Sequence, residues 1–438
     1  MEANISLMED LKQFLDDSPT AWHAVKEIIR RLKENGFEEL KEEESWDVQS
    51  NQSYFVQRNH SSLCAFITPQ SFPERIRLLA SHTDSPALKL KPEPEIRKNQ
   101  AVIFAVEVYG GPVLNSWLNR DLGLAGRIVY KSHQGNIQES LVNLNRHPLI
   151  IPQLAIHLDR EVNEKGLILN KQDHLNALAA LDQDLPPNSS YLETLIREEI
   201  SFAQLLDFDL FLVPLEKACF IGYNQQLLAS YRIDNLSSAH AILYALLKES
   251  HPHKHEIKMA MFWDNEEIGS QTAQGADSPF FNQTLERILW ALEVKRDDHF
   301  RIMSRSTCFS VDLAHSLHPN HVDKHDPQHQ PILGKGVVLK YNAQQKYATS
   351  ARSSVPIHVV AEMQKIPLQK FVSRNEMPCG STIGPIHASR TGMSTVDIGC
   401  GQLSMHSCRE ILSCQDQIGL SSLLESLMKV EKWPDISH

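Results

Sequence analysis

Short apolar segments that run directly into polar clusters are the feature that most constrains how this chain can fold. Four such segments end at His82, at Asp264, at Asp312 and at a glycine-rich turn before His406. Segments with helical periodicity, such as residues 237–248, lie between them. Strands that alternate with helices predict an α/β fold, in which helices cover both faces of a mainly parallel sheet and give three layers. Because sites in such sheets form beyond the carboxyl ends of the strands, we expect the polar clusters to form one.

A long internal stretch of the chain has a different pattern. Apolar and polar residues alternate at 101–109 and 126–130, and glycine- and proline-containing turns separate these segments. This pattern is typical of antiparallel β-structure. The sequence therefore predicts an α/β domain made of residues 1–89 and 223–438, interrupted by an inserted β-rich domain of residues 90–222.

The composition limits the classes of function. The 438 residues include 43 basic and 54 acidic side chains, and this net charge of −11 argues against a general nucleic-acid binder or a binder of anionic membranes. No apolar run approaches the about 18 residues of a membrane-spanning helix, and the N-terminal residues do not resemble a secretion signal. Seven cysteines without a CxxC pair are typical of reduced thiols. The sequence therefore predicts a cytoplasmic protein without a membrane or nucleic-acid partner.

Two isolated motifs are compatible with metal binding and also with ordinary structural roles. His82 is followed by Asp84, so it is either a surface histidine near a carboxylate or a metal ligand whose ring Asp84 orients. Asp234 opens a predicted helix. An aspartate there either caps the first turn or stays ionised at the positive end of the helix dipole and bridges two cations. Neither motif alone decides between its alternatives.

The run Asp264-Asn265-Glu266-Glu267 is the strongest local signal for chemistry. Three carboxylates within four residues repel one another, and the apolar residues 259–263 before them predict a buried strand. Full solvation of the three charges is therefore not expected, and a purely structural site would avoid the arrangement. Glu266 and Glu267 can divide the work, one binding a metal and the other acting as general base toward water.

The candidate ligands together form an inventory that suits a pair of divalent ions. They are His82, Asp234, Glu267, Asp312 and His406. Two ions about 3.5–4 Å apart, sharing one aspartate and each bound by one more carboxylate and one imidazole, would use all five. The five histidines between His315 and His329 predict either a polar loop or a further metal site. Motifs for a serine nucleophile, a nucleotide or a zinc finger do not occur at the required places.

Ordered blocks along nearly the whole chain resemble those of the aspartyl aminopeptidase family, which are cytosolic dinuclear zinc exopeptidases. The blocks are residues 80–86 (ASHTDSP), 109–111 (YGG), 117–122 (WLNRDL), 156–158 (IHL), 232–235 (RIDN), 264–270 (DNEEIGS), 312–320 (DLAHSLHPN), 379–385 (CGSTIGP) and 405–407 (MHS). The resemblance implies a zinc-exopeptidase fold that removes N-terminal residues from peptides. It also implies roles for individual residues.

The resemblance implies two zinc ions in each subunit. The implied ligands are His82 and Asp312 for one ion, Glu267 and His406 for the other, and Asp234 as the bridge between them. Glu266 would be the general base, and Asp84 would orient His82. No metal or base position departs from the family pattern. Because oxygen-rich sites with one imidazole each also accept manganese or cobalt, the residues alone leave the metal open.

The resemblance also implies an assembly and a substrate pocket. The inserted domain would mediate dimerisation, and dimers would build a dodecamer in which His157 reaches a neighbouring active site. Lys340 and Tyr347 fall where the family has substrate-pocket residues, which implies a preference for N-terminal Asp or Glu. Three alternatives stay open: a neutral-residue aminopeptidase, a related dinuclear deacylase or carboxypeptidase, and a non-catalytic assembly or cargo protein.

Overall fold

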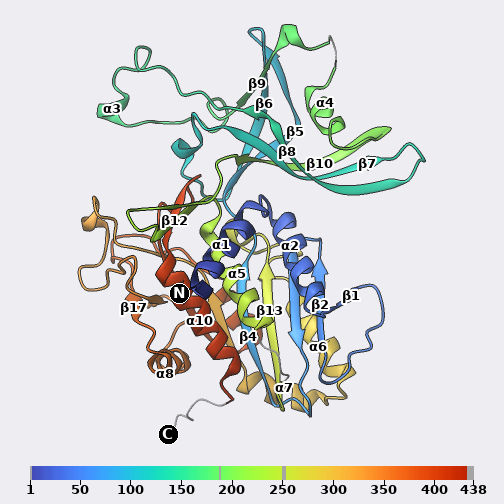
Figure 1. Cartoon of the computed structure of the whole chain (residues 1–438), viewed down its shortest axis with the longest axis vertical. Helices are drawn as coiled ribbons and strands as arrows, with labels where there is room; N and C mark the ends of the chain where they lie inside the picture. The colour runs from blue at the N-terminus through green and yellow to red at the C-terminus, as the bar shows by residue number, and fades with distance from the viewer. Residues whose placement is uncertain (1, 187–188, 249–252, 432–438) are drawn as a thin grey trace.

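The computed structural model describes residues 2–186, 189–248 and 253–431, which fold into two parts (Figure 1). A nine-stranded sheet lies in the lower part of the view, and a six-stranded sheet lies above it. The nine strands lie in the order β1 (Glu38–Leu40), β2 (Ser53–Arg58), β3 (Ser62–Ile67), β13 (Glu256–Trp263), β4 (Arg75–His82), β14 (Thr307–Val311), β18 (Ser394–Gly399), β16 (Val337–Lys340) and β17 (Leu368–Phe371).

The four central strands of the nine-stranded sheet are parallel. β13 and β14 flank β4, and β18 follows β14, each pair with parallel register. Their carboxyl ends therefore meet at one edge, where the polar clusters follow in the sequence. The predicted α/β class with a mainly parallel sheet is confirmed.

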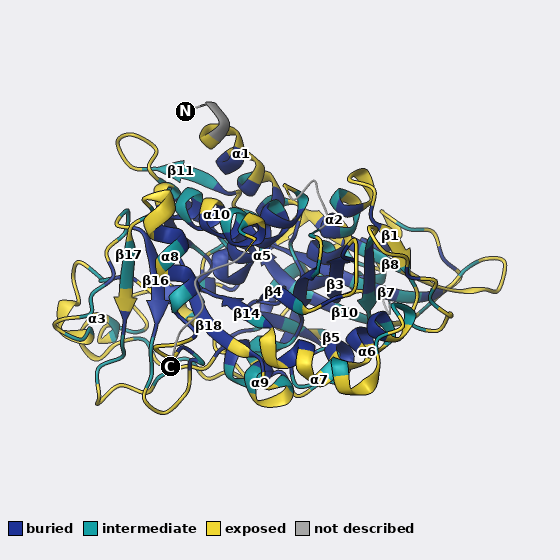
Figure 2. Ribbon diagram, turned by 90° about the horizontal axis from the view of Figure 1, so that it is seen from below, coloured by how far each residue is buried: buried dark blue, intermediate teal, exposed yellow. Residues whose placement is uncertain are grey.

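Helices cover both faces of this sheet (Figure 2). One face packs against α1 (Glu2–Asp16), α2 (Ala21–Glu34), α5 (Ile233–Leu247), α8 (Val355–Gln364) and α10 (Cys414–Lys429). The other face packs against α6 (Phe280–Ala291), α7 (Arg296–Arg305) and α9 (Ile383–Thr391). Side chains alternate between the two cores along each strand, as the pleat requires: Leu79 lies in the first core, and Leu78 and Ala80 lie in the second. The two buried faces hold the strand ends rigidly in place.

The six-stranded sheet is antiparallel and has a core of its own. Its strands lie in the order β8 (Ile137–Leu149), β7 (Leu122–Lys131), β10 (Gln204–Pro214), β5 (Ala87–Lys98), β6 (Ala101–Tyr109) and β9 (Ala177–Leu181). The short helices α3 (Val162–Lys165) and α4 (Tyr191–Arg197) belong to the same part of the chain. The domain boundaries at 89/90 and 222/223 stay a prediction, and β5 begins just before the first of them.

A smaller five-stranded sheet connects distant parts of the chain near the strand ends. It contains, in order, β11 (Cys219–Ile221), β12 (Leu227–Ser230), β20 (Glu410–Ser413), β19 (Gly401–Leu403) and β15 (Ala314–His315). The antiparallel pair of β19 and β20 closes a hairpin whose turn carries His406. β12 leads into α5, where Asp234 lies. Among the described helices, none is long and apolar enough to cross a membrane.

Candidate metal centre

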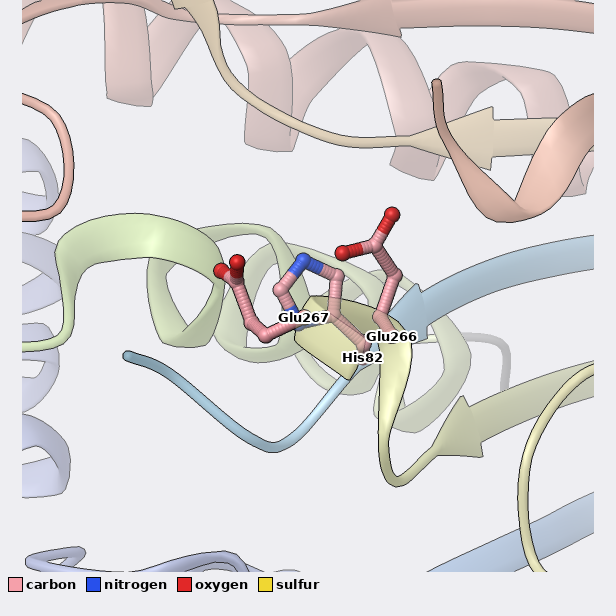
Figure 3. A group of neighbouring side chains, drawn as sticks. All are labelled: His82, Glu266 and Glu267. Atoms are coloured by element: carbon pink, nitrogen blue, oxygen red, sulfur yellow. The ribbon is translucent and has the colours of Figure 1, made fainter. Parts of the chain in front are cut away.

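The candidate residues come together at the carboxyl edge of the parallel strands. His82 is the last residue of β4, and Asp312 directly follows β14. Glu266 and Glu267 open the short 3-10 helix η3 (Glu266–Ile268), which follows β13. Figure 3 shows the imidazole of His82 between the carboxylates of Glu266 and Glu267, with the three side chains pointing the same way.

Two sets of possible ligands share one aspartate. In one set, ligand atoms of His82, Asp234 and Asp312 lie within 4.8 Å of one another. In the other, Asp234 joins Glu267 and His406 within the same distance. Each set therefore combines one imidazole, one further carboxylate and the shared Asp234, and together they contain the five ligands expected from the sequence.

Asp234 lies between the two histidines. Its Oδ1 atom is 3.4 Å from Nε2 of His82, and its Oδ2 atom is 3.6 Å from Nε2 of His406. Oδ1 is buried without a hydrogen-bond partner. A buried carboxylate oxygen without a donor is costly, and a cation between Asp234 and the imidazoles would compensate it. The donor set therefore fits two metal ions with Asp234 as the shared ligand.

The electrostatics of the cluster also favour cations. Burial would raise the pKa of Asp234, but the nearby imidazoles of His406 and His82 outweigh it and hold this pKa well below its usual range. Burial raises the pKa of Glu267 well above its usual range and that of Glu266 to about 8, and neighbouring carboxylates add to both. Divalent ions would relieve this repulsion between buried carboxylates.

Asp84 connects His82 to the two glutamates. Its Oδ1 atom lies 3.3 Å from Nδ1 of His82, the ring nitrogen opposite the proposed ligand atom. The backbone N–H groups of Glu266 and Glu267 donate to Asp84 at 3.1 Å each, and the hydroxyl of Tyr109 donates at 2.8 Å. The sequence predicted the contact with His82. It did not predict the contacts with the glutamate amides, which no side-chain motif encodes.

The second histidine is held differently. His406 adopts a left-handed backbone conformation with φ of 68°, and its Nδ1 atom lies 3.1 Å from the carbonyl oxygen of Gly111. Its backbone N–H donates to Glu410 at 2.7 Å. Glu410 was not predicted from the sequence. The only hint there is that it follows His406 by four residues.

The predicted substrate residues occupy different environments. Lys340 is buried, and its Nζ donates to Oδ2 of Asp312 at 3.0 Å and to the carbonyl oxygen of Leu313 at 2.9 Å. The ammonium also lies 5.0 Å from the ring centre of Tyr347, which is buried. His157 lies on an exposed loop of the six-stranded part. Lys340 and Tyr347 thus adjoin the candidate ligand Asp312 within the chain, whereas His157 does not lie in this group.

The histidine tract borders the same region. His315 and Tyr347 line a cavity of about 380 Å³, whose wall also includes Gln402, a neighbour of the candidate ligand Asp234. Further along the tract, the rings of His318 and His321 lie 4.8 Å apart, and His329 contacts Asp326 at 2.8 Å. Among the described residues, the tract supplies no member of a group close enough to hold a metal ion.

A parallel sheet with carboxylates and imidazoles at its strand ends is an arrangement suited to metal-dependent hydrolysis. Residues 14–427 match the model of the Aminopeptidase I zinc metalloprotease (M18) family. Curated relatives include a probable M18 family aminopeptidase 2 of Clostridium acetobutylicum, 38% identical over 97% of this chain and 99% of the relative. A probable M18 family aminopeptidase 2 of Pseudomonas putida is 39% identical over 98% of this chain and 99% of the relative. The chain therefore belongs to the M18 family of zinc metallo-aminopeptidases, which confirms the resemblance drawn from the sequence.

Solved structures have the same fold. The cryo-EM structure of the Ape4 and Nbr1 complex superposes with a TM-score of 0.92 and 34% identity over 97% of this chain and 85% of that chain. The S. cerevisiae mApe1 dodecamer superposes with a TM-score of 0.85 and 26% identity over 98% of this chain and 97% of that chain. An M18 aminopeptidase from Thermotoga maritima superposes with a TM-score of 0.85 and 26% identity over 98% of this chain and 96% of that chain.

Proposed function

We propose that this enzyme is a dinuclear zinc aminopeptidase that removes one N-terminal residue, preferentially Asp or Glu, from peptides. The observation that carries the proposal is the position of Asp234, whose two carboxylate oxygens face the two histidines of separate ligand sets. A carboxylate placed in this way could be shared by two ions, with His82 and Asp312 as further ligands of one and Glu267 and His406 as further ligands of the other. Nitrogen and oxygen donors in sets of this size suit zinc.

Glu266 is the proposed general base. It belongs to neither of the two ligand sets that contain Asp234, but its carboxylate lies within 4.8 Å of ligand atoms of His82 and Glu267. The ligand residues would hold zinc ions, whose chemistry when bound would be to acidify a water and polarise the scissile carbonyl. Glu266 takes a proton from the attacking water and returns it to the nitrogen of the breaking C–N bond. The products are a free amino acid and a peptide with a new N-terminal amine.

The preference for acidic residues is supported by a cation close to the ligands. A substrate carboxylate needs such a cation or several donors, because its unpaired burial costs several kcal/mol. Lys340 is buried beside Asp312, and its ammonium lies 5.0 Å from the ring centre of Tyr347, which lines the adjoining cavity. A neutral-residue preference is the second candidate. The ammonium of Lys340 already donates to Asp312 and Leu313, and this observation favours it.

We also propose a cytoplasmic homo-oligomer, a dodecamer built from dimers, in which the six-stranded part mediates dimerisation. A related structure is described as the mApe1 dodecamer. His157 is flanked by apolar side chains that are largely exposed in the single chain: Leu154 by 58%, Ile156 by 46% and Leu158 by 75%. An exposed apolar loop of this kind is typical of an interface.

The decisive experiment for the reaction compares two adjacent glutamates. Glu266→Gln should keep the wild-type zinc content and lose turnover by ~10²–10⁴-fold or more, because it removes proton transfer and no ligand. Glu267→Gln is the matched control and should lose zinc. The assay measures zinc per subunit and hydrolysis of Asp, Glu, Leu and Ala substrates, with N-blocked peptides included. More than about a tenth of wild-type turnover in Glu266→Gln, or cleavage of blocked peptides, contradicts the proposal.

The assembly is tested by mixing two inactive variants. His157→Ala subunits and Glu266→Gln subunits, allowed to exchange, should regain activity because some sites then combine an intact Glu266 with an intact neighbouring His157. Absence of activity after proven exchange would assign His157 to its own chain or to no role in the reaction.

A further inference from the structure

Glu410 contacts two of the proposed metal ligands through their backbone. Its carboxylate is 2% exposed and lies at the start of β20. Oε2 accepts the backbone N–H of Asp234 at 2.9 Å, and Oε1 accepts the backbone N–H of His406 at 2.7 Å. One side chain thus ties together the shared ligand and a ligand of the second ion, which are far apart in the sequence.

Both backbone groups need such a partner. Asp234 lies in a non-helical stretch at the start of α5, with φ of −82° and ψ of 108°, so its N–H is outside the regular helix ladder. His406 adopts φ of 68° without being glycine, a conformation that persists only when its surroundings enforce it. The bond from its N–H to Glu410 and the contact of its ring with Gly111 fix both ends of this residue.

We propose that Glu410 is the positioning residue that sets the His406 side of the metal centre before the ion binds. The proposal rests on the ligand assignment made above. Glu410 touches neither substrate nor metal in this role. It fixes the backbone of Asp234 and His406, so that the carboxylate and the imidazole already face each other when zinc arrives.

Because Glu410 uses both carboxylate oxygens as acceptors, the proposal can be tested by a substitution that removes only one of them. A glutamine has the same shape but only one acceptor oxygen, and its NH₂ group would face a backbone N–H. Glu410→Gln therefore leaves one buried donor without an acceptor. If the role depends on two acceptors, Glu410→Gln should lose zinc affinity nearly as severely as Glu410→Ala.

Asp416 provides a matched control. Its carboxylate is 1% exposed and accepts two backbone N–H groups, those of Gly334 and Gly336, at 2.7 Å each. Asp416→Asn therefore removes the same kind of bond from residues that are not proposed ligands. It should lower stability and leave zinc affinity close to the wild-type value.

The experiment measures zinc per subunit in the full-length, zinc-loaded enzyme against rising concentrations of a chelator. In Glu410→Gln the more weakly held ion should leave with an affinity reduced by ~10–100-fold, as for other outer partners of metal ligands. Its loss should not add to that of His406→Ala in a double-mutant cycle, because both changes act on the same ion. Wild-type release from Glu410→Gln, or equal loss in Asp416→Asn, would overturn the proposal.

Two further measurements distinguish a failure of the role of Glu410 from a failure of the proposed dinuclear function. Amide exchange in the metal-stripped wild type needs no variant: the N–H groups of Asp234 and His406 should exchange far more slowly than in an unfolded peptide. Fast exchange of both, with the sheet core still protected, would overturn the role of Glu410 alone. A wild type that never holds two zinc ions would overturn the dinuclear function, and the role of Glu410 with it.

Discussion

The two halves of the proposed metal centre share Asp234 but differ in how their histidines are placed. On one side, His82 ends a central strand and its side chain is 2% exposed. Its Nδ1 atom lies 3.1 Å from the backbone carbonyl oxygen of Asp84 and 3.3 Å from the Asp84 carboxylate, and Lys340 supports Asp312. On the other side, His406 lies in a hairpin turn with its side chain 29% exposed. The carbonyl oxygen of Gly111 lies 3.1 Å from its Nδ1 atom, and the carboxylate of Glu410 accepts its backbone N–H.

This difference shows two ways of fixing a ligand. A residue at the end of a buried parallel strand inherits its position from the register of the sheet and the two packed faces. A residue in a turn has no such register, so its backbone conformation and the orientation of its side chain must each be fixed by separate contacts. We therefore expect the His82 side to hold its ion more tightly and the His406 side to respond more to changes in supporting residues.

Removing the shared ligand should have the largest effect and should erase the difference between the halves. Asp234→Asn takes a negative charge from both ligand sets at once. The affinity of both ions should fall by more than the ~10–100-fold typical of an outer partner. Zinc per subunit after dialysis is the measurement. Two full equivalents in this variant would rule out the bridging role.

Removing one imidazole at a time should separate the halves. His82→Ala and His406→Ala should each keep about one zinc ion, because each leaves one ligand set intact. The metal-free proteins should differ in stability: His82→Ala should lower Tm more, since its side chain is buried and its loss leaves a cavity, whereas His406 is partly exposed. Equal Tm values in the two metal-free variants would contradict this difference between the halves.

The sequence predicted which candidate residues lie at strand ends better than it predicted the contacts that support His406. His82, Glu266, Glu267 and Asp312 follow apolar segments, so the pattern of strands alone placed them at one edge. The carboxyl edge of a parallel sheet is a rule of topology and needs no knowledge of side-chain packing. The mainly parallel sheet and its two covering layers were predictable for the same reason.

The supporting contacts of the turn half were not predictable. Glu410 binds backbone N–H groups, and these have no signature in the amino-acid sequence. Lys340 follows the same logic. The family resemblance pointed to it as a substrate-pocket residue, but its burial against Asp312 depends on β16 pairing with β17 and β18, a non-local arrangement. Such contacts require the tertiary structure.

Weakening the support behind His82 should have a smaller, graded effect. Asp84→Asn keeps the shape but loses charge and one acceptor, so zinc affinity or turnover should fall by ~10–100-fold. Tyr109→Phe is the control, because it removes only the hydroxyl that donates to Asp84 and should cost less. Chelator titration and kcat/KM measure the two effects. If zinc affinity or kcat/KM fell as much in Tyr109→Phe as in Asp84→Asn, the tyrosine hydroxyl and not the charge of Asp84 would be the group that matters.

The smallest expected effect concerns Lys340, which lies where the His82 half adjoins the proposed substrate pocket. Lys340→Ala should lower kcat/KM for N-terminal Asp or Glu peptides by ~10-fold or more, because charge-assisted hydrogen bonds contribute roughly 1.5–3 kcal/mol. Leu and Ala peptides should be nearly unaffected. Lys340→Met is the matched variant, since it keeps an unbranched apolar stem beside Tyr347 and removes only the charge.

The contact of Lys340 with Asp312 makes the pattern of losses informative. If Lys340 only supports the ligand, then zinc affinity should fall and all four substrates should lose rate equally, because Asp312 serves every substrate alike. If Lys340 also receives the substrate carboxylate, zinc content stays at the wild-type level and the loss is confined to Asp and Glu. A wild-type enzyme that prefers Leu would remove the need for a cation in the pocket. Lys340 would then belong entirely to the support of the buried half.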